Sequence, residues 1–339
     1  MLDQTRRGPG AVTSSAGRAN PDQDPGGPRP RVLVASELRP LLPPDPLPGF
    51  EVVWISTEDP TPKGDYAAII PILSRSIGEE ELTGLPNLTV LAQCAVGYDN
   101  IDLQAAAKRG IPVTNTPDVL TESTADLTWA LILAVARRMK EGQEMLAQDA
   151  WTGWSPTQLL GLELNGRALG IVGAGRIGQA VGRRAVGFGM DVLYVDAHPR
   201  HEFEEAVGAR RSDLSELLSE SDVVTLHVPS TPETRGLFDA RRFSLMKTGS
   251  LFINTARGDL VDEGALLDAL TSGRLGGAGL DVFSREPQVP RELVEHPKVV
   301  ALPHIGSATT QTRRAMAALA VKNAIEVLEG REPLTPVRF

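Results

Sequence analysis

Residues 170–178 read Gly-Ile-Val-Gly-Ala-Gly-Arg-Ile-Gly, and this stretch decides the fold. The apolar run Ala168–Val172 that leads into the glycines is typical of a buried strand, and the apolar residues that follow recur at helical spacing. The pattern G-x-G-x-x-G between a strand and a helix predicts a dinucleotide-binding βαβ unit, whereas the bare pattern is weak evidence. The alternative is a glycine-rich turn in a sheet protein that binds no nucleotide.

Each part of this fingerprint has an expected task. Gly173 permits the tight turn, Gly175 lets the backbone approach a pyrophosphate, and Gly178 lets helix and strand pack closely. The phosphates are expected at the free N–H groups of the helix N-terminus, where Arg176 and Ile177 also lie. These five residues are therefore predicted to bind the cofactor.

The strand after the fingerprint ends at Asp196, 18 residues beyond Gly178. An acidic side chain there accepts hydrogen bonds from the ribose hydroxyls of the adenosine and repels a 2′-phosphate, so NAD(H) is favoured. Arg200 lies just beyond and weakens that discrimination, so NADP(H) stays possible.

Strand-like runs alternate with helical stretches on both sides of the fingerprint, which predicts an α/β fold with parallel sheets. The expected strands are Arg31–Ser36, Glu51–Ser56, Tyr66–Ile72, Thr89–Ala95 and Ile111–Asn115 in a first series, and Ala168–Val172, Asp191–Val195, Val223–Val228, Ser250–Asn254, Gly279–Val282 and Val299–Leu302 in a second. At roughly 100–200 residues per domain, a chain of 339 residues is expected to hold about two domains.

Two long helices are predicted outside the strand series. The first, Ser123–Arg138, has Thr121 or Ser123 to cap it and apolar residues almost all round, so we expect it to be buried. The second, Thr310–Glu329, follows the last strand and is expected to return and pack on the first series.

Composition excludes several classes of protein. The net charge is −9, which disfavours binding to nucleic acid or to an anionic membrane surface. The longest strongly apolar run, Trp129–Ala136, is far short of the roughly 20 residues that span a bilayer. Cys94 is the sole cysteine, so we expect no disulfide, no metal site and a cytoplasmic protein. Residues 1–30 hold almost no large apolar side chains and are expected to be a disordered tail.

Three residues with acid–base or anion-binding chemistry follow three predicted strands of the second series. Arg257 follows Ser250–Asn254, Glu286 comes after the strand that contains Asp281, and His304 follows Val299–Leu302. Loops at the carboxyl ends of parallel strands are where α/β proteins bind ligands. Arg, Glu and His are therefore expected to converge on one ligand; the alternative is three surface residues, one of them in a salt bridge.

From about residue 31 to the C-terminus, the sequence resembles the D-2-hydroxyacid dehydrogenases. The matching motifs are Gly173–Gly178, Asn254–Asp259, Gly279–Pro287 and Pro303–Ala308. Within the family it is most similar to the glyoxylate/hydroxypyruvate reductases, because of the segment Trp151–Pro156.

The resemblance implies two Rossmann-like or flavodoxin-like parallel-sheet domains with the active-site cleft between them. Residues 31–118 plus 306–339 would form the flavodoxin-like substrate-binding domain, and residues 119–305 the NAD-binding Rossmann domain. It also implies a homodimer.

The resemblance further implies a catalytic role for the three converging residues. His304 would give a proton to the substrate carbonyl, Glu286 would orient the imidazole, and Arg257 would grip the 2-keto acid. The backbone N–H groups of Val96 and Gly97 would hold the substrate carboxylate from the other domain.

The remaining implied contacts concern the cofactor and the partner subunit. Asp281 would bind the nicotinamide carboxamide. Further cofactor contacts are implied at Thr124, Pro229, Thr234, Thr255 and Gly306. Trp154 would reach into the active site of the partner subunit, although from the residues alone Trp151 and Trp154 fit a buried core pair equally well.

The implied reaction is NAD(H)-dependent reduction of glyoxylate or hydroxypyruvate to the D-2-hydroxy acid. A first alternative is D-3-phosphoglycerate dehydrogenase, because Arg75 is a candidate for the extra cation that a phosphorylated substrate needs. A second is a non-enzymatic, NADH-sensing corepressor, which can keep the same site residues. D-lactate dehydrogenase is less favoured because the Trp151–Pro156 segment fits the glyoxylate/hydroxypyruvate group better. Formate dehydrogenase is disfavoured by the residues that follow His304.

Overall fold

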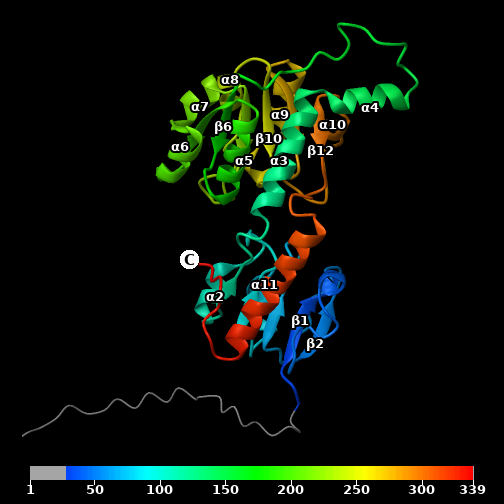
Figure 1. Cartoon of the computed structure of the whole chain (residues 1–339). Helices are drawn as coiled ribbons and strands as arrows, with labels where there is room; N and C mark the ends of the chain where they lie inside the picture. The colour runs from blue at the N-terminus through cyan, green and yellow to red at the C-terminus, as the bar shows by residue number, and fades with distance from the viewer. Residues whose placement is uncertain (1–27, 339) are drawn as a thin grey trace, which may run out of the picture.

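Residues 28–338, which the computed structural model describes, form two parallel β-sheets in two lobes joined end to end (Figure 1). The predicted α/β class with two parallel-sheet domains is confirmed. The tail expected at residues 1–30 falls almost wholly outside the described residues. No helix between residues 28 and 338 is long and apolar enough to cross a membrane.

The lower lobe in Figure 1 is built on the first sheet, whose strand order is β2-β1-β3-β4-β5. This 2-1-3-4-5 order is the flavodoxin-like one. Its strands are β1 (Arg31–Ala35), β2 (Glu51–Ile55), β3 (Ala68–Ile70), β4 (Val90–Ala92) and β5 (Val113–Thr114), with helices η1 (Ser36–Leu41), α1 (Glu79–Thr83) and α2 (Leu103–Lys108) between them.

The upper lobe is built on the second sheet, in the order β12-β11-β10-β9-β6-β7-β8. Counted from its first strand outward, this is the 3-2-1-4-5-6 Rossmann order with one further strand. The strands are β6 (Ala168–Val172), β7 (Asp191–Val195), β8 (Arg210–Arg211), β9 (Val223–Leu226), β10 (Ser250–Asn254), β11 (Leu275–Leu280) and β12 (Val299–Ala301). The helices are α5 (Arg176–Gly187), α6 (His201–Val207), α7 (Leu214–Glu220), α8 (Ala240–Leu245), η2 (Gly258–Leu260), α9 (Glu263–Thr271) and α10 (Arg291–Glu295).

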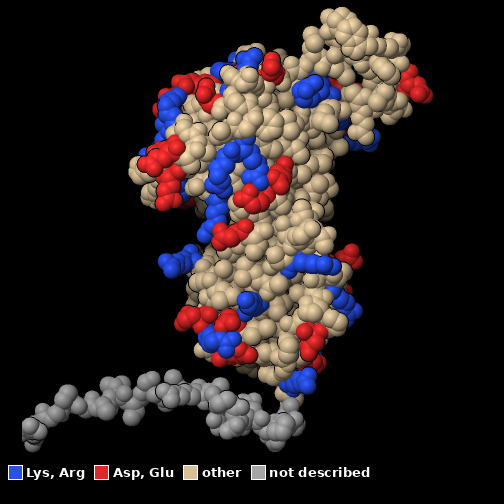
Figure 2. Space-filling view, viewed as in Figure 1, with Lys and Arg blue, Asp and Glu red and all other residues tan. Residues whose placement is uncertain are grey.

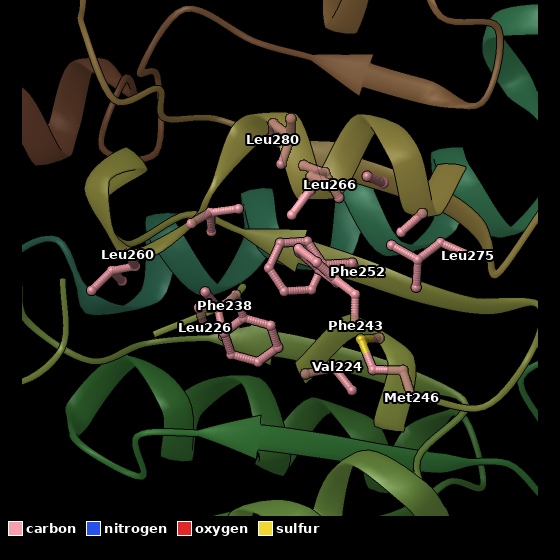
Figure 3. Close-up of a cluster of buried hydrophobic side chains, with 14 of the residues drawn as sticks. Val224, Leu226, Phe238, Phe243, Met246, Phe252, Leu260, Leu266, Leu275 and Leu280 are labelled. Carbon is pink, nitrogen blue, oxygen red and sulfur yellow. The ribbon is translucent and has the colours of Figure 1, made fainter. Parts of the chain in front are cut away.

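A cluster of buried hydrophobic side chains with phenylalanines at its centre covers one face of the second sheet (Figure 3). Phe252 of β10 lies 5.0 Å from Phe238 and 5.2 Å from Phe243, measured between ring centroids, at angles typical of favourable aromatic pairs. Every residue of β9 and β10 is buried, because parallel strands are covered on both faces. This packing holds fixed the carboxyl ends of the strands.

Helix α3 (Thr121–Ala136) covers the other face of the second sheet. The structure differs from the sequence prediction at the start of this helix and at the start of strand β11. The N-cap of α3 is Leu120, with no side-chain cap, so the capping predicted for Thr121 or Ser123 is wrong. Strand β11 starts at Leu275, earlier than the predicted Gly279. The glycines at its start are typical of a loop in the sequence, but in the structure the missing side chain of Gly277 lets α3 approach the strand. A Cβ on Gly277 would lie 2.6 Å from Val135 of that helix.

Helix α11 (Thr310–Leu328) crosses back and packs on the first sheet, as the sequence predicts. It joins the first core through Met316, Ala317, Ala320, Val321 and Ala324. The chain therefore passes between the lobes twice, and we propose that the domains are 31–118 plus 306–339 and 119–305. One further helix, α4 (Met139–Ala147), was not predicted; it and the loop that follows project from the upper lobe (Figure 1).

Candidate active site

His304 lies in a turn after β12 and carries strained backbone. Its φ is +54°, a region that residues other than glycine rarely adopt and that is often found at functional sites. Its side chain is about one-third exposed, and its Nδ1 lies 2.8 Å from Oε2 of Glu286. Since Glu286 occupies Nδ1, the Nε2 nitrogen is the one left for a ligand.

Asp281 anchors the turn that carries His304. One of its carboxylate oxygens accepts a hydrogen bond of 2.8 Å from the N–H of Ile305, the other one of 2.7 Å from Gly306, and its carbonyl accepts from His304 N–H. Burial raises the pKa of Asp281, although these N–H groups and the charge of His304 oppose the rise. The carboxylate that was predicted to bind nicotinamide thus also fixes the turn of His304.

Glu286 is held by its own loop as well as by His304. Its Oε1 accepts a 2.9 Å hydrogen bond from the N–H of Phe283. Burial alone would raise the pKa of Glu286, but these hydrogen bonds and the charges of His304 and Arg257 outweigh it, so the pKa lies below its usual range. Glu286 is therefore a carboxylate near neutral pH, and the proton between the two groups belongs to His304 Nδ1.

Arg257 follows β10, and its side chain meets the lower lobe. Its Nε donates a 2.9 Å hydrogen bond to Oδ1 of Asp99, and Nη1 donates to the carbonyl of Ala256 at 2.7 Å. The Nη2 atom lies against the backbone of Gly97, only 1.5 Å from where a Cβ on that residue would be. The structure thus brings together Arg257 and Gly97, which are 160 positions apart in the sequence.

Amide side chains hold the loop that contains Val96 and Gly97. Asn115 Nδ2 donates to the carbonyl of Val96 at 2.8 Å. The buried Gln93 donates to Asn100 Oδ1 at 2.8 Å, and Asn100 in turn donates to the carbonyl of Arg75 at 2.7 Å. Sequence reasoning missed these residues and Asp99, although Asp99 lies in the same short motif as Gly97.

The glycine fingerprint has the geometry that a dinucleotide needs. Gly173 has φ +99°, and a Cβ there would lie 2.7 Å from the carbonyl of His227 at the strand-order reversal between β6 and β9. A Cβ on Gly178 would lie 2.1 Å from Gly173 O. No described atom lies within 4 Å of a Cβ placed on Gly175, which leaves the start of α5 open to a phosphate. These residues therefore fit the pyrophosphate of the dinucleotide that the motif implies.

Asp196, at the end of β7, lies beside an open hollow of about 590 Å³. Its Oδ1 accepts a 3.0 Å hydrogen bond from Arg200, and its carbonyl accepts a 2.9 Å hydrogen bond from Arg211, which also lines the hollow. Two cations therefore accompany the acid that was predicted to discriminate against a 2′-phosphate.

The other predicted cofactor residues fall into small groups around this sheet. Gly306 contacts Thr124 and Asp281, with 3.4 Å and 3.2 Å between its Cβ position and their nearest atoms. The Thr255 hydroxyl pairs with Thr128 at 2.9 Å, and Thr234 donates to the carbonyl of Pro229 at 2.6 Å. Arg176 is exposed and forms an ion pair with Asp118 between the lobes, and Ile177 packs in both cores.

Trp151 and Trp154 are 53% and 83% exposed, so the alternative that they form a core pair is wrong. They lie in the projecting loop after α4, at the end of the upper lobe that is far from the lower lobe (Figure 1). Figure 2 shows few charges on this projection, and Met139, Leu146 and Leu160 are exposed there too. Trp154 is therefore not part of the site formed by its own chain.

Comparison with known proteins gives consistent results. Residues 129–306 match the family model described as "D-isomer specific 2-hydroxyacid dehydrogenase, NAD binding domain". The chain is 48% identical over 270 residues to a glyoxylate reductase of Thermococcus litoralis, covering 78% of this chain and 82% of the relative.

Two solved structures share the whole architecture. The first is an NADPH-dependent glyoxylate/hydroxypyruvate reductase from Sinorhizobium meliloti in complex with NADP and malonate, with TM-score 0.81 and 37% identity over 91% of this chain and 97% of that one. The second is a D-lactate dehydrogenase from Aquifex aeolicus complexed with NAD and lactic acid, with TM-score 0.79 and 32% identity over 88% and 96%.

Proposed function

This chain belongs to the D-isomer specific 2-hydroxyacid dehydrogenase family, and from that premise we propose that it reduces glyoxylate or hydroxypyruvate to the D-2-hydroxy acid with NADH. As a member it is an NAD(P)-dependent oxidoreductase that acts on CH–OH groups. The observation that carries the proposal is the convergence of Arg257, Glu286 and His304 at the ends of the adjacent strands β10, β11 and β12, on the sheet that holds the glycine fingerprint.

His304 is the proposed general acid. Glu286 holds Nδ1 and stabilises the protonated imidazole, and the strained turn, anchored by Asp281, fixes the direction of Nε2. A proton at Nε2 is then available to the carbonyl oxygen of the substrate as that oxygen becomes an alkoxide. NAD(H), when bound, supplies or accepts the hydride.

Arg257 is the proposed substrate clamp. Asp99 occupies the N–H on Nε and Ala256 one N–H on Nη1, so one N–H on Nη1 and both on Nη2 remain, and Nη2 lies beside Gly97. A carboxylate held there also meets the backbone N–H groups of Val96 and Gly97. Such a clamp orients the reacting carbon and stabilises the developing negative charge on oxygen.

The cofactor-binding roles belong to residues of the upper lobe. We propose that the start of α5, with Gly173, Gly175 and Gly178, binds the pyrophosphate, and that Asp196 binds the adenosine ribose. Because Arg200 and Arg211 surround Asp196, the preference for NADH over NADPH is expected to be modest. The remaining cofactor contacts proposed are Thr124, Arg176, Ile177, Pro229, Thr234, Thr255, Asp281 and Gly306.

We propose a homodimer that uses the projection of α4 and its loop. Exposed Trp151, Trp154 and Leu160 on a weakly charged arm are typical of an interface. Trp154 would then contact the active site of the partner subunit. Buried, unpaired Cys94 is compatible with the cytoplasm, where we place the protein.

Arg75 speaks against D-3-phosphoglycerate as the substrate. Its guanidinium is buried and donates to Asp59 O at 3.0 Å, to Thr61 Oγ1 at 2.9 Å and to the carbonyl of Ser56. It holds the loop after β2, so it is not available as the extra cation for a phosphate.

The test is a panel of 2-keto acids assayed with NADH and with NADPH, followed by the absorbance of the reduced cofactor. Fastest turnover with glyoxylate or hydroxypyruvate supports the proposal. Tight NADH binding without turnover of any keto acid would favour the corepressor alternative, and fastest turnover with 3-phosphohydroxypyruvate would favour the phosphoglycerate enzyme.

A further inference from the structure

We propose that Asp99 is the positioning residue for Arg257: its carboxylate fixes the Nε edge of the guanidinium so that the outer edge faces the bound 2-keto acid. This inference rests on the proposed function. It assigns to the lower lobe a side chain that acts on the reaction through an arginine of the upper lobe.

The contact is specific in its geometry. Asp99 Oδ1 accepts from Arg257 Nε at 2.9 Å, although 158 residues separate the two side chains in the sequence. Nη1 is held at 2.7 Å by the carbonyl of Ala256. A planar guanidinium fixed at two of its edges keeps one orientation, and the N–H groups that remain lie on Nη1 and Nη2.

The loop that carries Asp99 is itself held by hydrogen bonds on both sides of this residue. Asp99 Oδ1 lies 2.9 Å from the position of a Cβ on Gly97, so the same glycine makes room for both partners of the pair. On either side of Asp99, Asn115 holds Val96 O and Gln93 holds Asn100 Oδ1. The backbone continues this anchoring, because Asn100 O accepts from Ile77 N at 2.8 Å.

The negative charge of Asp99 distinguishes a role in positioning Arg257 from a role in attracting the anionic substrate. A carboxylate beside Arg257 lowers the positive charge that an anionic keto acid meets, so Asp99 does not strengthen binding by Coulomb attraction. The side chain of Arg257 is 21% exposed and that of Asp99 is 38% exposed, and ion pairs this open contribute little to stability. Orientation of the guanidinium is the property that the pair improves, and orientation affects the rate of the chemical step more than binding.

The experiment compares D99N and D99A with wild type in steady-state reduction of glyoxylate and hydroxypyruvate. We expect kcat to fall at least about tenfold in D99A while KM for the keto acid changes less than about threefold. D99N keeps an oxygen that accepts from Nε, so its kcat should lie between those of wild type and D99A. The matched control is D102N, which makes the same charge change three residues away and keeps an N-cap side chain for α2, so its kcat should be unchanged.

A double-mutant cycle with R257Q tests whether Asp99 acts through Arg257. Because the orientation of Arg257 no longer matters in R257Q, adding D99A should cause no further loss of kcat. A merely structural role would give additive losses, a lower Tm or weaker NADH binding, the last measured by fluorescence titration.

Three outcomes decide between the claims. Active wild type together with D99A within about twofold of its kcat overturns this inference alone, and so do additive losses in the cycle. Calorimetry with oxamate, an unreactive analogue of glyoxylate, on the NADH-loaded protein should show similar affinity in wild type and D99N. A wild type that neither turns over a keto acid nor binds oxamate overturns the proposed function and this inference with it.

Discussion

The two halves of the candidate site are built in different ways. The His304–Glu286 half belongs to one sheet, where adjacent strands β11 and β12 present the pair and Asp281 anchors the turn. The Arg257–Gly97 half exists only where the two lobes meet, and it depends on a residue without a side chain. The first half can be rigid within one domain, whereas the second forms only when the lobes are in contact.

Removing the imidazole tests the first half and should give the largest effect. We expect H304A to lower kcat/KM by about three orders of magnitude, the size of a general-acid contribution, because no other described side chain is placed at Nε2 to give the proton. NADH binding, measured by fluorescence, should stay near wild type. Turnover close to wild type would show that the proton comes from another group.

Filling the space at Gly97 tests the second half. A Cβ there would lie 1.5 Å from Nη2 of Arg257, so G97A must displace the guanidinium. We expect kcat/KM to fall about a hundredfold, the effect of misplacing a catalytic group by about an ångström. The matched control is G187A, because no described atom lies within 4 Å of its Cβ and its φ is not positive. Equal activity of G97A and wild type would contradict the close approach.

The contrast between the halves also explains what the sequence could predict. Strand exits are local features, so Arg257, Glu286 and His304 could be placed at one edge of one sheet from apolar runs alone. The pairing of Arg257 with Asp99 could not, because it depends on how the two lobes meet. The buried Gln93 and the half-buried Asn115 were missed for a related reason: a polar residue near a strand end gives no sequence signal for the acceptor that its side chain will meet.

The bounds of the strands differ from the prediction where glycines interrupt an apolar run. Strands β6, β7 and β10 have the predicted bounds because their apolar runs are continuous, whereas the start of β11 was missed because Gly276 and Gly277 look like a loop. Only their neighbours in space explain those glycines: a Cβ on Gly276 would lie 2.3 Å from the carbonyl oxygen of Gly249, and one on Gly277 would lie 2.6 Å from Val135 of α3. Exposure of Trp154 was likewise not decidable from its apolar character.

Neutralising Glu286 sharpens the comparison, because it alters the first half without emptying it. The pKa of Glu286 lies below its usual range, so the wild-type carboxylate is charged throughout the neutral range, and a charged carboxylate at Nδ1 stabilises an imidazolium. In E286Q this stabilisation is lost, and the pH at which reduction declines should move down by about one unit. The measurement is kcat/KM for the keto acid as a function of pH, and an unchanged profile would argue that Glu286 only packs against the ring.

The smallest expected effect lies outside both halves, at the adenosine ribose. We expect D196A to reduce the ratio of NADPH to NADH dissociation constants by about tenfold, since it removes both a hydrogen-bond acceptor for NADH and a charge that repels the 2′-phosphate. R200A should change the ratio in the opposite direction and by less, because it frees the Asp196 carboxylate from its 3.0 Å partner while Arg211 remains. Fluorescence titration with each cofactor measures both ratios. If the two variants shift the ratio in the same direction, Arg200 does not act by neutralising Asp196, and the cofactor preference has another origin.

Because this site lies at β7, away from β10–β12, kcat with saturating NADH should stay near wild type in both variants, which separates choice of cofactor from the chemistry of the two halves.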